Sequence, residues 1–441
     1  MINMNPSRAM LLFVLPMIAG NLFQQLYNMA DSAIAGQFIG PQALSAIGAS
    51  YAITNVFIAS ASGGSMGCAV VISQYFGSGD YKKMKTCIST ALVSILSVSL
   101  ILAAAGSALS SAVLGLIKTP PDVFDGALIY LKIYFYGLPF LFMYNALAAV
   151  FNALSDSRTP LVLLIFSSLL NIFLDLHFIT KLNMGIAGAA WATLISQGVS
   201  AVISFTVLVL RVKKIKSEPF RYFSAPLLPV MGRIAVPSIL QQSIVSVGSL
   251  MVQSVINSFG TLVLAGYTAA TKIHFVLIVP VLALGNACAT FTAQNIGAGK
   301  PERVRSGYIA GIKITAVIYS AVLVCVILFA DSILGIFLKD PVAAKTIETG
   351  RGYLHFIAPF YYIFGLKALT DGVLKGSGDV TVFTLSNLVN LTIRVLAAFA
   401  LSPFIGARAV WYAIPAGWCV NFIIGGLRYR SGKWKEKKVI H

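Results

Sequence analysis

Long apolar runs alternate with short polar segments along the whole chain. Stretches such as 91–105 and 314–330 are continuously apolar, without the two-residue alternation of a membrane β-strand. A helix that spans a bilayer needs about 20 apolar residues. The pattern therefore predicts twelve spanning helices in two sets of six. The first set is expected at 9–36, 42–73, 86–112, 125–154, 159–181 and 184–211, and the second at 230–258, 262–294, 305–330, 343–374, 381–402 and 408–428.

The composition agrees with this all-α integral membrane class. Of the 441 residues, 58% are hydrophobic and only 10% are charged. A soluble domain has about 25% charged residues, so this chain cannot cover a water-exposed surface. The lipid bilayer is the expected surrounding of the protein.

The net charge of +18 could suggest a nucleic-acid partner until the basic residues are placed. With the N-terminus in the cytoplasm, 21 of the 32 lysines and arginines fall on the cytoplasmic side and five in outer loops. This is the positive-inside bias of membrane proteins. It predicts that both termini are cytoplasmic, and it removes the argument for nucleic acid.

The two halves of the chain resemble each other. Residues 74–79 (QYFGSG) recur as 294–299 (QNIGAG), 220 residues later, and Pro139 falls on Pro359 at the same spacing. Six helices per half give the halves the same orientation, as in the parallel repeats of some secondary transporters. The alternative is a duplicated scaffold without transport. The predicted parts are an N-terminal lobe (1–211), a linker (212–229), a C-terminal lobe (230–428) and a basic tail (429–441).

No motif in the chain indicates enzyme chemistry or a bound metal. The Gly-x-Gly repeats at 77–79 and 297–299 lie between membrane helices, so tight turns with left-handed glycines are expected rather than a phosphate loop. The five cysteines show no paired spacing, which argues against a disulfide framework or a metal site. A nucleotide-binding loop and the common hydrolase motifs are absent from the sequence, so transport would draw on an ion gradient.

Two acids fall inside predicted spans, where a charged group costs about 2.5–3.5 kcal/mol even on lenient scales. At 1.5 Å per residue, Asp31 lies about 13 Å below the outer end of its helix and Asp175 about 9 Å below. Thr193 of the sixth helix lies about 13 Å down, and Asn171 precedes Asp175 by one turn. Asp31, Asp175 and Thr193 therefore share one layer in the outer half of the N-terminal lobe, and Asn171 lies on the same helix face as Asp175. We assign them to an ion-binding site.

A polar stripe extends from the acid layer along the first helix. Gln24, Tyr27 and Asn28 precede Asp31 at helical spacings, which predicts that this face lines a cavity rather than lipid. Asn145 is assigned to the same cavity. Neighbouring carboxylates with amide and hydroxyl oxygens suit a proton or Na⁺. The alternative is that Asp31 and Asp175 only cap or hydrogen-bond neighbouring helices.

Other charged residues also lie at membrane level. Asp371 lies near the cytoplasmic end of its helix with Lys367 four residues earlier, which predicts a structural ion pair. Lys272 and Arg394 either face the cavity or pair with acids. His274 stands alone and is expected to pack in the interior.

Several segments resemble the MATE (multidrug and toxic compound extrusion) family, and the resemblance covers essentially the whole chain. Similar segments are 25–31 (QLYNMAD), 74–79 (QYFGSG), 137–139 (GLP), 156–160 (DSRTP), 171–175 (NIFLD) and 294–299 (QNIGAG), with prolines at 16 and 237. Sodium-coupled members of one branch of the family carry a glutamate shortly after the second proline. Here residues 238–243 (SILQQS) contain no acid. A second cation site in the C-terminal half is therefore doubtful.

The resemblance implies a two-lobe antiporter of a prokaryotic inner membrane that exports small cationic or amphipathic compounds. It implies no cofactor, a monomeric protein, and H⁺ or Na⁺ as the coupling ion. It also implies that Asp31, Asn171, Asp175 and Thr193 form the coupling-ion site. The alternative is a lipid-linked oligosaccharide flippase of the same superfamily, which would need a strongly cationic cavity.

Overall fold

The computed structural model describes residues 1–337 and 343–440, and the described residues form helices and turns without a strand. The first half contains α1 (Pro6–Phe38), α2 (Pro41–Ser78), α3 (Tyr81–Leu116), α4 (Pro121–Ala153), α5 (Arg158–Leu176), the π-helix η1 (His177–Lys181) and α6 (Gly185–Lys214). The second half contains α7 (Leu227–Asn257), α8 (Thr261–Gly297), α9 (Pro301–Phe337), α10 (Ala343–Ile357), the 3₁₀ turn η2 (Ala358–Phe360), α11 (Tyr361–Ser377), α12 (Val380–Ile405), α13 (Arg408–Arg430) and η3 (Lys433–Glu436).

The all-α membrane class is confirmed. Within the described residues, ten helical stretches are long and apolar enough to cross a bilayer. The predicted spans at 230–258 and 343–374 are not among these ten. The segment predicted as a helix at 343–374 is helical in the structure but interrupted, because Pro359 lies in the 3₁₀ turn between α10 and α11. Proline removes a backbone donor and disfavours an unbroken helix.

The chain divides into two compact units. One unit is Ala19–Ile239, and the other joins Met1–Ile18 to Leu240–His441. Each boundary between the two units falls inside a helix. One lies two residues after Pro16 of α1, and the other lies two residues after Pro237 of α7. These units differ from the N-terminal lobe (1–211) and the C-terminal lobe (230–428) predicted from the sequence. The two lobes stay a prediction about which parts of the protein move during transport.

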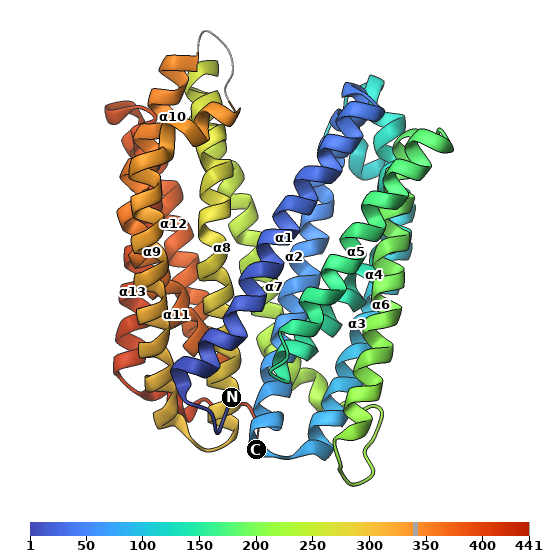
Figure 1. Ribbon diagram of the computed structural model, residues 1–441, viewed down its shortest axis with the longest axis vertical. Coiled ribbons are helices and arrows are strands. Elements are labelled where there is room, and N and C mark those ends of the chain that lie inside the picture. Colours follow the sequence, from blue (N-terminus) through green and yellow to red (C-terminus); the bar gives the residue numbers. More distant parts are fainter. Residues whose placement is uncertain (338–342, 441) are drawn as a thin grey trace. The chain divides into compact units, whose positions relative to one another are not determined.

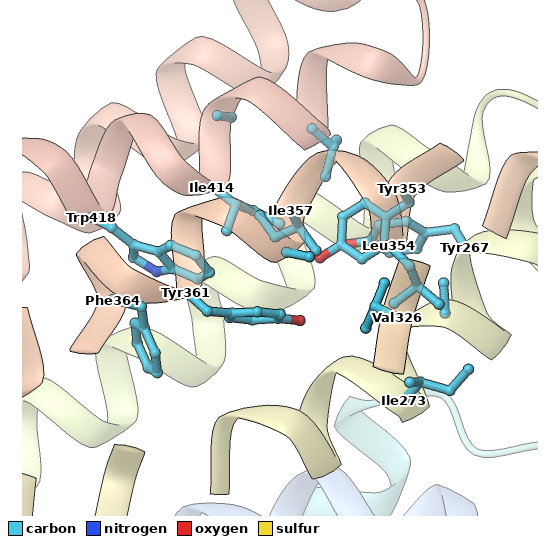
Figure 2. Packing of buried hydrophobic residues seen from close by; sticks show 14 of the residues in the cluster. Tyr267, Ile273, Val326, Tyr353, Leu354, Ile357, Tyr361, Phe364, Ile414 and Trp418 are labelled. Atoms are coloured by element: carbon cyan, nitrogen blue, oxygen red, sulfur yellow. The ribbon is translucent and has the colours of Figure 1, made fainter. Parts of the chain in front are cut away.

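Figure 1 shows the helices of each unit running along one another. Within Ala19–Ile239, α4 packs on α2, α3 and α6, while α5 packs on α6. In the other unit α8 packs on α9, α10 and α11, and α13 packs on α11 and α12. Aromatic side chains fill much of that second core, where Figure 2 shows Trp418 and Phe364 beside Tyr361.

The two copies of the repeat contain corresponding turns and corresponding ion pairs. Gly79 and Gly299 adopt φ angles of +78° and +68°, which confirms the predicted left-handed turns. In one unit Arg211 pairs with Asp156, which lies two residues before α5. In the other, Nε of Arg428 lies 2.5 Å from the carboxylate of Asp379, which precedes α12. An arginine–aspartate ion pair therefore lies at the predicted cytoplasmic end of each half.

Candidate ion-binding site

The two predicted acids come together within the unit Ala19–Ile239. Asp31 lies on α1 and Asp175 on the last turn of α5, and their carboxyl groups interact directly. Asp175 is fully buried, and its Oδ1 has no hydrogen-bond partner. The π-helix η1 begins at His177, two residues after Asp175. Such π-turns are frequent at functional sites.

Asn171 connects the acid pair to its neighbours. Its amide orientation follows from the surrounding donors and acceptors. The amide nitrogen donates to the hydroxyl of Tyr27 at 3.0 Å and to Oδ2 of Asp175 at 2.9 Å. The amide oxygen accepts from the backbone N–H of Thr193 at 3.1 Å. All four residues of the predicted ion site, together with Tyr27, thus belong to one arrangement.

Tyr130 of α4 is a member of this site that sequence reasoning missed. It lies within electrostatic range of both Asp31 and Asp175. It also lines a narrow pocket between α4 and α6. The pocket is lined by Tyr130, Tyr134, Gly137, Leu141, Ala190, Thr193, Leu194 and Gln197. Because Tyr130 and Thr193 belong to both, the pocket opens beside the acid pair.

The remaining predicted cavity residues lie apart from that pocket. Gln24 donates to Asn28 at 3.2 Å on the same turn of α1, and Asn28 is exposed. Asn145 is partly buried on α4 and donates to the backbone carbonyl of Leu141 at 2.9 Å. The structure therefore groups Tyr27 with the acids, whereas Gln24, Asn28 and Asn145 are not among the residues that line the pocket.

The acid pair lacks a basic partner. Neither Asp31 nor Asp175 forms an ion pair with the lysines or arginines of the described chain. Their neighbours are the phenols of Tyr27 and Tyr130 and the amide of Asn171. Buried carboxylates without a cation are costly. The arrangement is therefore suited to take up a proton or a small cation.

Comparison with known proteins shows which family the chain belongs to. The MatE family model matches residues 16–176 and 237–400, so it covers a segment of each half. The chain belongs to the MATE family. It is 32% identical to the probable multidrug resistance protein YpnP of Bacillus subtilis, over 99% of this chain and 97% of that protein. It is also 24% identical to a FAD transporter of Shewanella oneidensis, over 95% of this chain and 92% of that one.

Solved MATE structures share the fold. An outward-facing multidrug resistance MATE transporter of the MOP superfamily superimposes with a TM-score of 0.89 at 25% identity, covering 99% of this chain and 98% of the other. The expected membership of the MATE family is thus confirmed, and with it a multi-pass transporter rather than a duplicated scaffold.

Asp371 of this MATE chain forms the predicted ion pair. Its carboxylate lies 2.7 Å from Nζ of Lys367, and the amide nitrogen of Asn387 donates to the same oxygen at 3.3 Å. Lys367 also donates to the amide oxygen of Asn387 at 3.0 Å. These contacts tie α11 to α12. The residue belongs to a structural network, in contrast to the acids at 31 and 175, which have no base.

Proposed function

We propose that the protein is a secondary active multidrug efflux antiporter. It exports organic cations or other toxic compounds in exchange for H⁺ or Na⁺ by alternating access. Family membership and the names of its relatives support drug export. The distribution of basic residues supports a multi-pass topology with both termini in the cytoplasm.

The observation that carries the proposal is the buried acid pair without a base. Two carboxyl groups at close range in a membrane interior repel each other when both are charged. A bound proton or cation removes that repulsion. An incoming organic cation would offer the same compensation, so ion and substrate would compete for Asp31 and Asp175.

Both coupling ions fit the acid pair. A proton on one carboxyl group removes the repulsion between Asp31 and Asp175, and Na⁺ takes carboxylate, amide and hydroxyl oxygens of the kind that these residues, Asn171 and Thr193 carry. The gradient that drives export therefore identifies the ion.

The competition gives a mechanism for exchange. Cation entry from outside would neutralise the acids and drive closure of the outer half, and release toward the cytoplasm would restore their charge for the next substrate. A ligand shifts such an equilibrium only through different affinities for the two states. Tyr130 and Thr193 support this coupling, because they line the pocket and surround the acids.

The test is efflux of a cationic fluorescent dye from bacteria that lack their own pumps. Wild type is compared with Asp31→Asn and Asp175→Asn, under a proton gradient and then under a sodium gradient. The matched control is Asp125→Asn, an exposed acid on α4. We expect wild type and control to export the dye and both site variants to stop while still reaching the membrane.

Normal export by both site variants would make the acid layer structural. A wild type that moves no dye under either gradient would favour the lipid-linked flippase instead. Lys272 and Arg394, the membrane-level cations of the second half, are the residues that would support that alternative.

A further inference from the structure

A second polar layer lies inside the unit formed by Met1–Ile18 and Leu240–His441. On α8, Tyr267, Thr271 and His274 follow at helical spacings of four and three, so they lie along one face. Nδ1 of His274 is 2.8 Å from the hydroxyl of Tyr361, and its ring stacks on Trp418 at 6.1 Å. This face of α8 thus packs against the aromatic side chains of Tyr361 and Trp418, which we call the aromatic wall.

Tyr353 of α10 continues this wall. Its ring meets that of Tyr267 edge-on at 5.3 Å and lies 6.2 Å from His274. Figure 2 shows the rings of Tyr267 and Tyr353 next to each other. The polar groups that these buried residues contribute are phenol hydroxyls, an imidazole and an indole N–H, with no carboxylate among them.

Arg394 of α12 adds a positive charge to this layer. It interacts electrostatically with Tyr267, His274 and Tyr353. Among the acids that the structure describes, none forms an ion pair with Arg394. Its Nε is buried without a hydrogen-bond partner. An unpaired buried donor of this kind calls for a ligand, an ion or water.

Arg394 and Thr271 lie at the same depth along their helices. The last residues of α12 lie beside the segment before α8, since a Cβ on Gly406 would lie 3.9 Å from the ring of Phe259. Measured from that end at 1.5 Å per residue, Thr271 lies about 15 Å into α8 and Arg394 about 16 Å into α12. The guanidinium and the hydroxyl therefore share one layer.

The internal repeat relates this layer to the acid site. Asn171 lies 15 residues after the ion-paired Asp156, and Arg394 lies 15 residues after the ion-paired Asp379. The position that holds an amide beside two acids in one copy thus holds a guanidinium beside aromatic rings in the other. The charge of the site is reversed between the copies.

We propose that Arg394 binds the anionic group, a carboxylate or a phosphate, of an amphipathic molecule in the C-terminal half. A guanidinium holds such groups through two parallel hydrogen bonds, and Nε supplies one of the donors. Thr271 supplies a hydroxyl at the same level. The proposal rests on the transport function above and widens its substrates from cations to organic anions. A phospholipid headgroup would present the same chemistry as a dissolved anion.

The test is probe binding to the purified full-length protein, followed by fluorescence anisotropy. The probes are flavin mononucleotide, which carries a phosphate, and rhodamine 6G, which is a cation. We expect Arg394→Gln to weaken flavin mononucleotide binding at least tenfold and to leave rhodamine 6G binding unchanged. Arg394→Lys should retain part of the anion affinity. The control is Arg351→Gln, which removes a charge that pairs with Asp331 at the exposed surface.

A second arm identifies a lipid as the source of the anionic group. Wild type and Arg394→Gln are purified from the same membranes, and the retained lipids are quantified by mass spectrometry. Loss of an anionic phospholipid from the variant assigns the site to a headgroup. If both proteins bind flavin mononucleotide equally and retain the same lipids, the proposal is overturned. Export of rhodamine 6G by wild type is measured separately. Failure of the proposed anion site is therefore distinguishable from failure of the proposed efflux function.

Discussion

We expect the two repeated ion pairs, Arg428 with Asp379 and Arg211 with Asp156, to differ in strength, because their surroundings differ. Asp379 has 3% of its side chain exposed, and Arg428, with 20% exposed, is its ion-pair partner. The Asp379 carboxylate accepts no capping bond from α12. Arg428→Gln would leave this buried charge uncompensated. Breaking a buried pair costs about 3–5 kcal/mol, and partial exposure of the arginine puts the expected loss near the lower end, about 3 kcal/mol.

Arg211→Gln is the matched substitution in the other copy. Arg211 has 43% of its side chain exposed, which weakens the pair through solvent screening. Asp156 also keeps other donors: the backbone N–H groups of Arg158 and Thr159, each at 3.1 Å, and the hydroxyl of Thr159 at 2.5 Å. The expected loss is therefore only about 1 kcal/mol.

Equilibrium unfolding in mixed micelles of sodium dodecyl sulfate, followed by circular dichroism, measures both losses. The account predicts a difference of about 2 kcal/mol between the variants. The double variant Asp379→Asn/Arg428→Gln should regain at least about 1 kcal/mol relative to Arg428→Gln, because the uncompensated charge is gone. Equal losses, or a larger loss for Arg211→Gln, would refute this reasoning.

Two further predictions concern packing and the acid site. A Cβ on Gly67 would lie 2.4 Å from the backbone of Ala235 on α7, so Gly67→Ala should lower the unfolding free energy by about 2 kcal/mol. Gly48→Ala, with open space around it, should not lower it, and a similar loss in both would contradict the close approach. Tyr130→Phe removes a hydroxyl beside both acids and should raise the half-maximal dye concentration for efflux about fivefold, at roughly 1 kcal/mol. An unchanged dye dependence would exclude the phenol from the site.

Much of the fold could be predicted because lipid imposes simple rules. Apolar runs long enough to span a bilayer placed the helices, and the repeat placed the turns at Gly79 and Gly299. The sequence did not predict that the helix is interrupted at Pro359. Pro139, its counterpart in the repeat, lies inside the unbroken helix α4, so a proline at this position does not by itself predict a break. Whether a helix breaks depends on the neighbours that can satisfy its freed backbone groups.

The site was partly predictable for a different reason. Buried acids stand out in apolar spans, and their depth along each helix brought Asp31, Asp175 and Thr193 to one layer. Tyr130 gave no such signal, because an aromatic residue in a membrane helix is equally suited to packing. Arg394 was noticed only as an isolated cation. Its place beside the aromatic rings of Tyr267 and Tyr353 depends on contacts between helices, which one sequence does not contain.

The most direct test of the central claim is ion release when a cationic dye binds to the purified protein. Rhodamine 6G is added in weakly buffered detergent solution while pH is recorded, and a parallel sample loaded with radioactive sodium reports sodium release. The account predicts that wild type releases an ion in proportion to the dye bound, and that the variant Asp31→Asn/Asp175→Asn releases none. Full dye binding by wild type without release of either ion, or equal release from the double variant, would contradict it.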